Sequence, residues 1–149
     1  MLFQRVIRTD PEKVFVVVKN SYSTASLANG QVVQWDFLTD VDGVGVSIPS
    51  GMATNLGNAV AGVAVETIAH NAYGLVQVYG YHAAVRARAN TTGDTIALGT
   101  DLRPPLAAGS FCAESADLDG TLNYHSMGFA LSIWSSWTTT TILAFIKAL

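Results

Sequence analysis

The run of residues 75–88, LVQVYGYHAAVRAR, constrains the fold of this chain more than any other segment. Its apolar, aromatic and β-branched residues are typical of a strand. Fully extended, the run would span about 46 Å at roughly 3.3 Å per residue, which is longer than a usual strand. We therefore expect a bend or a bulge near Gly80.

Regular alternation would divide this run into two faces. One face would carry Leu75, Gln77, Tyr79, Tyr81, Ala83 and Val85. The other would carry Val76, Val78, His82, Ala84, Arg86 and Arg88. Because both faces begin with apolar side chains, we expect the early half of this strand to be buried on both sides.

The rest of the chain also divides into short strand candidates separated by turns. The candidate strands are residues 2–8, 13–20, 31–37, 58–69, 95–98, 106–114, 126–134 and 138–146. Turn-forming residues separate them, including Asn29-Gly30, residues 70–74 and residues 99–105. This pattern predicts an all-β chain, with residues 1–149 forming a single antiparallel β-sandwich or barrel of jelly-roll-like design.

Composition excludes several classes of protein. Charged residues make up 13% of the chain, against about 25% in typical domains, and hydrophobic residues make up 50%. A chain this apolar is not expected to be disordered, and its single cysteine, Cys112, cannot form an internal disulfide. The net charge of −3 argues against binding to nucleic acid, which requires clustered Lys and Arg.

The mean hydropathy of +0.33 raises the question of a membrane. The chain has no apolar stretch of about 20 residues, and Arg5, Arg8 and Asp10 interrupt the N-terminal segment. We therefore expect neither a membrane partner nor a signal peptide. The apolar excess is expected to be covered by another subunit, in a homodimer, a homotrimer or a larger assembly.

Motifs for ligand binding are incomplete. Residues 43–48 begin like a dinucleotide-binding loop but lack the third glycine. A calcium loop starting at Asp40 would need a glutamate at its twelfth position, where Gly51 stands. The sequence therefore predicts no cofactor.

Catalytic groups are equally sparse. His70, His82 and His125 are far apart in the chain and have no cysteine or histidine at a zinc-binding spacing, so no metal site is expected. Glu66 and Glu114 could form a glycosidase-like carboxylate pair, but the sequence does not fix their separation. We therefore expect a protein that is not an enzyme.

The tryptophans near the C-terminus are the clearest candidates for contact with a partner. Trp134 and Trp137 either close the end of a barrel or anchor an interface, since tryptophan provides a large, rigid contact. The apolar ends of the chain are expected to pair as terminal strands at subunit interfaces. The candidate interface residues are Leu2, Phe3, Trp134, Trp137, Ile142 and Phe145.

Three segments resemble the head decoration, or cement, proteins of tailed bacteriophages. They are SLANGQVVQWD at residues 26–36, GVAVETIAHNAYGLVQVYGYHAAVRA at residues 62–87, and TTGDT with the following LGT at residues 91–100. These soft patterns of small residues cover about a third of the chain.

The resemblance implies a non-enzymatic virion protein that is made in the host cytoplasm and binds the outer capsid surface. Its partners would be the major capsid protein and further copies of itself, and it would cement neighbouring capsid subunits. The β-tulip-like fold of such proteins is the alternative architecture. Another virion component, such as a tail or fibre module or a glycan-binding jelly roll, is the alternative function.

Overall fold

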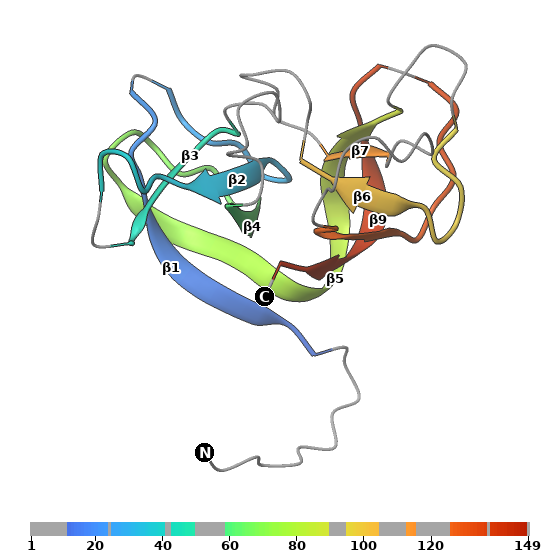
Figure 1. Ribbon diagram of the computed structural model, residues 1–149, viewed down its shortest axis with the longest axis horizontal. Helices are drawn as coiled ribbons and strands as arrows, with labels where there is room; N and C mark the ends of the chain where they lie inside the picture. Colours follow the sequence, from blue (N-terminus) through green and yellow to red (C-terminus); the bar gives the residue numbers. More distant parts are fainter. Residues whose placement is uncertain are drawn as a thin grey trace.

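The computed structural model describes residues 12–23, 25–40, 43–49, 59–89, 95–104, 113–115, 126–136 and 138–148 (Figure 1). The described residues form nine strands and no helix. The strands are β1 (Val14–Asn20), β2 (Val32–Trp35), β3 (Gly45–Ser47), β4 (Val60–Ala64), β5 (Tyr73–Arg88), β6 (Asp101–Arg103), β7 (Ala113–Ser115), β8 (Gly128–Ala130) and β9 (Thr140–Lys147).

The strands close into two five-stranded rings that share β5. The first barrel runs β1-β3-β2-β4-β5 and closes through the pairing of β1 with β5. The second barrel runs β5-β7-β6-β8-β9 and closes through the pairing of β5 with β9. Figure 1 shows the two lobes side by side, with β5 passing from one to the other.

Each barrel contains one parallel pair among its described strands. Strand direction reverses at every antiparallel pairing, so a closed ring of five strands must contain an even number of antiparallel pairs and at least one parallel pair. The parallel pairs are β1 with β3 and β5 with β7. The predicted all-β barrel or sandwich is confirmed, but its strands form two linked rings instead of the two stacked sheets of a jelly roll.

Each barrel has its own apolar core. The first core consists of Val18, Leu27, Val33, Val46, Ile48, Ala61, Ala64, Ile68, Val76 and Val78. The second consists of Val32, Val63, Val85, Ala87, Ile96, Leu102, Met127, Ala130, Ile142, Ala144 and Ile146. Val32 and Val63 belong to strands of the first barrel, so the outer wall of that barrel packs against the second.

The predicted bend in β5 is confirmed at Gly80, where the strand leaves the first barrel. Before this point β5 pairs with β1 and β4, and from Tyr79 onward it pairs with β9. Gly80 has φ +100°, and a Cβ atom there would lie 2.0 Å from the carbonyl oxygen of Glu12. Glycine therefore permits both the backbone conformation and the close approach.

Several sequence-based expectations are wrong. Residues 95–98 do not form a strand; Ile96 makes an isolated bridge to Trp134, and β6 lies within the segment predicted as a loop at 99–105. The short strand β3 was not anticipated. The early half of the run 75–88 is not buried on both sides, because Leu75 is 39% exposed and Tyr79 is 36% exposed. Regular alternation fails where the β5–β9 register shifts between His82 and Val85.

Candidate interaction surface

Exposed apolar side chains gather on the outer face of β1 and the first half of β5. Val17 pairs with Leu75 and Lys19 pairs with Tyr73, so these side chains lie next to one another across the two strands. We call Phe15, Val17, Tyr73 and Leu75 the β1–β5 face; all four are exposed, Val17 by 63%. Val18 and Val76, which alternate with these side chains, belong to the first core, and Val16 packs against it.

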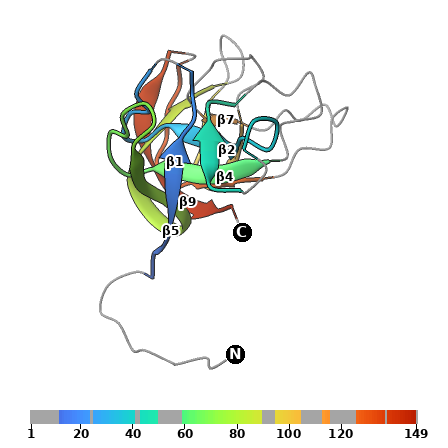
Figure 2. The same ribbon diagram turned by 90° about the vertical axis from the view of Figure 1, so that its left-hand side faces the viewer.

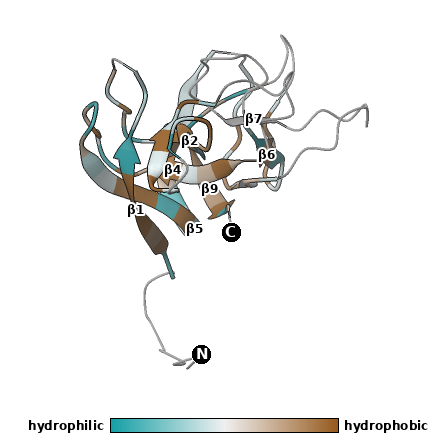
Figure 3. Cartoon of the chain, turned by 60° about the vertical axis from the view of Figure 1, so that its left-hand side comes forward, coloured by the Kyte–Doolittle hydropathy of each residue, from teal (hydrophilic) through white to brown (hydrophobic). Residues whose placement is uncertain are grey.

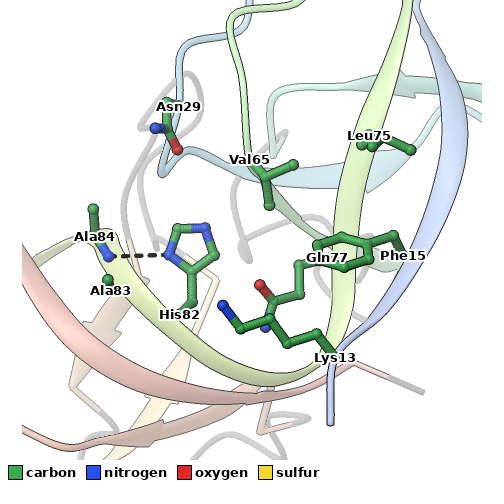
Figure 4. Close-up of a pocket in the computed structure, with 9 residues that line it drawn as sticks. All are labelled: Lys13, Phe15, Asn29, Val65, Leu75, Gln77, His82, Ala83 and Ala84. Carbon is green, nitrogen blue, oxygen red and sulfur yellow. Dashed lines mark hydrogen bonds between the residues drawn. The ribbon is translucent and has the colours of Figure 1, made fainter. Parts of the chain in front are cut away.

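A groove of about 340 Å³ adjoins this face (Figure 4). Its lining residues are Lys13, Phe15, Asn29, Val65, Leu75, Gln77, His82, Ala83 and Ala84. Lys13 carries the positive charge of this lining, and its Nζ lies 5.6 Å from the centroid of the Tyr81 ring, a cation–π contact.

His82 has a structural role at the base of the groove. Its side chain is buried, and its Nδ1 accepts a hydrogen bond from the backbone N–H of Ala84 at 3.1 Å (Figure 4). Burial and the positive charge of Lys13 lower the pKa of His82, and a hydrogen bond with the backbone of Ala64 opposes this shift. A neutral imidazole that accepts from Ala84 holds the strand beyond the bend.

Gln77 braces the same bend from inside the sheet. Its side chain is 1% exposed, and its Nε2 donates to the carbonyl oxygens of Tyr79 at 3.1 Å, Gly80 at 2.9 Å and Tyr81 at 3.0 Å. The two protons of this amide are therefore shared among three carbonyl groups at the bend.

The groove lining consists mainly of apolar and amide side chains, and its titratable groups are Lys13 and His82. His82 is engaged with the backbone of Ala84, and Lys13 lies against the Tyr81 ring. In the part of the chain that the structure describes, no three His, Cys, Asp or Glu side chains are arranged to hold a metal ion.

The polar candidates named from the sequence do not assemble into one site. His70 lies in the exposed turn before β5, where its Nδ1 is 2.7 Å from the carbonyl oxygen of Tyr22. The Oε1 atom of Glu66 accepts from the N–H of Leu75 at 2.9 Å beside the first barrel. Glu114 belongs to β7 of the second barrel. His125 and Cys112 lie outside the described residues.

The candidate interface residues fall in different environments. Trp134 is half-buried, packs against the second core and donates from Nε1 to the carbonyl oxygen of Thr138 at 3.3 Å. Ile142 is 4% exposed and belongs to the second core. Leu2, Phe3 and Trp137 lie outside the described residues.

Phe145 is half-buried in an aromatic row on the outer face of the second barrel. Its ring stacks on Phe129 with centroids 5.2 Å apart and meets Tyr79 edge-on at 5.1 Å. Part of its surface is therefore already used within the chain.

The β1–β5 face was missed from the sequence, although a signal for it exists. In KVFVVVKN, consecutive apolar residues occupy both faces of β1, whereas a barrel interior covers one. The apolar side chains on the other face of β1 must therefore either pack against another element or stay exposed to solvent.

Comparison with known proteins identifies a likeness in fold. No protein-family model and no curated protein sequence matches the chain. Among solved structures, the chain is similar to the head fibre gp8.5 N base of bacteriophage phi29, with a TM-score of 0.50 and 16% sequence identity. The match covers 89% of this chain and 93% of that chain. The described strands thus belong to an all-β barrel architecture that also occurs in that head fibre base.

The described ranges contain no helix with the length and hydrophobicity needed to cross a bilayer.

Proposed function

We propose that this chain is a non-enzymatic structural component of a bacteriophage virion, mounted on the outer surface of the head. The observation that carries the proposal is the likeness to the phi29 head fibre base, which extends over nine-tenths of both chains, at 89% and 93%. A match of this extent involves most of the chain, not an isolated hairpin.

The surface chemistry supports the same role. A protein that attaches to a capsid lattice needs apolar contact area on a rigid module, because weak contacts repeated over many copies add through multivalency. The β1–β5 face supplies such area on paired strands, and the adjoining groove adds a cation, Lys13, among apolar walls. Its partner in this role is the major capsid protein.

The finer role we propose is cementing, in which the chain bridges neighbouring capsid subunits. The second candidate is the base of a head fibre, and the phi29 neighbour favours it by its own description. A cement protein occupies a regular lattice position and resists shell disruption. A fibre base joins the head to a further appendage.

The first experiment is quantitative mass spectrometry of purified particles, counting this chain against the major capsid protein. A ratio near one, or a simple fraction of it, supports a regular position on the head. A few copies per particle would move the chain to a vertex or the tail. Its absence from the particles would overturn the virion proposal and direct attention to glycan arrays and hydrolase panels.

Heating separates the two candidates. Particles stripped of this chain are expected to release their genome at a lower temperature than decorated particles, and adding the purified chain should restore the original value. An unchanged release temperature, with the chain present at lattice copy number, would contradict cementing and leave the fibre base.

A tryptophan variant tests the contact surface expected from the sequence. Trp134→Ala combined with Trp137→Ala should leave a folded chain that binds capsids poorly. Because Trp134 also packs against the second core, circular dichroism must first show that the variant is folded at the binding temperature. Normal decoration by the folded variant would remove these residues from the interface.

A further inference from the structure

We propose that two copies of this chain associate along the β3-side edge of β1 at residues 13–17, where no pairing is made by the residues that the structure describes. The two edges form an antiparallel strand pair about a two-fold axis at Phe15. This inference concerns the purified chain alone and does not depend on a place in the virion. It rests on the backbone pairing of β1, on the exposure of its side chains and on the register that a second copy can adopt.

The hydrogen bonds of β1 show which backbone groups face outward. The N–H of Asn20 donates to Ala72 on the β5 side at 2.9 Å, whereas the N–H of Lys19 donates to Val44 on the β3 side at 2.8 Å. Because successive N–H groups in a strand point in opposite directions, those of Val17 and Phe15 point to the β3 side, like that of Lys19.

Strand β3 covers little of that edge. Among the described residues, its pairing with β1 consists of Lys19 with Gly45 and Asn20 with Val46. Before this pair the chain turns at Gly43, which has φ +74° and donates its N–H to the carbonyl oxygen of Asp40 at 3.3 Å. Figure 3 shows that the N-terminal half of β1 is apolar, and among the described strands this half pairs with β5 alone.

Residues 14–18 of this edge contain no charged residue and no proline, although the pairing with β5 shifts register between Val14 and Phe15. Charged residues, prolines or bulges normally interrupt such an edge, because its unpaired N–H and C=O groups can pair with another chain. Residues 14–18 are instead VFVVV, with lysines only at the flanking positions 13 and 19. Phe15 and Val17 are 43% and 63% exposed on the outer face of this same segment.

An antiparallel register with a second copy of the chain fits the uncovered length of this edge. Pairing with β3 already occupies the edge at Lys19, so an added strand must end near Val17. A two-fold axis at Phe15 places Phe15 opposite itself and Lys13 opposite Val17 of the other copy, and both are hydrogen-bonded pairs. Moving the axis to Val16 would place Lys13 opposite Lys19, where like charges oppose each other.

In this arrangement the sheets of the two copies become continuous. The Phe15 side chains meet on the outer face, and the alkyl chain of Lys13 lies beside Val17 of the other copy. The contact is isologous, so it closes with two copies and leaves no β1 edge free for further growth.

The first test measures the mass of the full-length chain by light scattering across a dilution series. We expect a dimer that dissociates on dilution. Val17→Lys should weaken it by roughly tenfold or more, since the new charge faces Lys13 of the other copy. Ile133→Lys is the matched control: Ile133 is 65% exposed, close to the 63% of Val17, and the variant should dimerise like the parent.

A cross-link tests the register even if Val17→Lys proves unstable. In a Cys112→Ser background, Phe15→Cys should form an interchain disulfide under mild oxidation, because Cα atoms of a hydrogen-bonded antiparallel pair lie about 5.5 Å apart, within disulfide range. Ile133→Cys should stay reduced under the same conditions. The proposal is overturned if the parent chain remains monomeric. It is also overturned if the chain forms a dimer that persists in Val17→Lys and the Phe15→Cys variant forms no interchain disulfide.

Discussion

The side-chain amide of Gln77 donates to the carbonyl oxygen of Gly80 at 2.9 Å, so a buried side chain of β5 braces the bend of its own strand. The bend in turn allows one strand to serve two barrels. Ring closure in both barrels thus depends on a short segment of β5, and this segment provides the sharpest tests of the fold.

Replacing the amide of Gln77 should destabilise the protein. Gln77→Met keeps the length of the side chain but removes the amide that donates to three carbonyl groups at the bend, so the free energy of unfolding should fall by about 2 kcal/mol. Gln31→Met is the control: Gln31 is similarly buried and accepts from the N–H of Ala28, and its loss should be about half as large. Equal losses in urea unfolding would contradict the bracing role.

The close approach at Gly80 predicts a second difference in stability. Gly80→Ala places a methyl group 2.0 Å from the carbonyl oxygen of Glu12 at φ +100°, so we expect a loss of about 3 kcal/mol or more. Gly99→Ala is strained at φ +80° but meets no atom within 4 Å, so it should lose about 1–2 kcal/mol. Thermal unfolding of both variants tests the comparison. A smaller loss of stability in Gly80→Ala than in Gly99→Ala would show that the backbone of the first barrel can shift to accommodate the methyl group.

The environment of His82 predicts a dependence of stability on pH. Its pKa in the folded protein is lowered from 6.5 by burial and by Lys13, so the unfolded chain binds the proton more readily. The stability that this group contributes is complete above about pH 6.5 and is lost as the pH falls from there through the lower pKa of the folded state.

His82→Asn should flatten this dependence, because an asparagine oxygen can accept the Ala84 N–H without titrating near neutral pH. His70→Asn, at an exposed turn, is the control and should follow the parent chain. Urea unfolding between pH 5 and 8 measures how the free energy of unfolding changes with pH in each variant. An unchanged pH dependence in His82→Asn would exclude this histidine as its source.

Phe145 is predicted to stabilise the second barrel. Phe145→Ala removes its contacts with Phe129 and Tyr79 and should lower the free energy of unfolding by about 2 kcal/mol. Leu143→Ala, two residues earlier on the same strand and 37% exposed, should cost less than about 1 kcal/mol. Capsid binding by Phe145→Ala must therefore be compared at temperatures where the variant is fully folded.

Much of the local structure could be predicted from the sequence. The expected strand at residues 13–20 contains β1, and the expected strand at residues 138–146 overlaps most of β9. The turn before β5 lies at His70 and Asn71, where Asn71 adopts φ +61°. These features follow from properties that neighbouring residues carry in any fold, namely β-branching, alternation and the conformational preferences of glycine and asparagine.

The candidate contact surface could be predicted less well. Tryptophan and the apolar chain ends indicated an interface, but Trp134 and Ile142 both contribute to the packing of the second barrel. The same strand pattern is compatible with several barrel arrangements, and the arrangement decides which alternate residues face a core. Phe15 and Val17 are exposed because the first barrel closes with Val18 in its core and these two side chains on its outer face.

The sequence by itself determined that this chain forms β-strands, where β5 must bend, and that its apolar surface exceeds what a single barrel interior covers. The tertiary structure decided that the strands close as two rings around a shared β5, with one parallel pair in each. It also decided that Arg103, a charged residue on a short strand, is fully buried while Val17 is exposed. Pairing partners lie far apart in the chain, and ring closure is a property of all five strands together, which no local pattern of residues encodes.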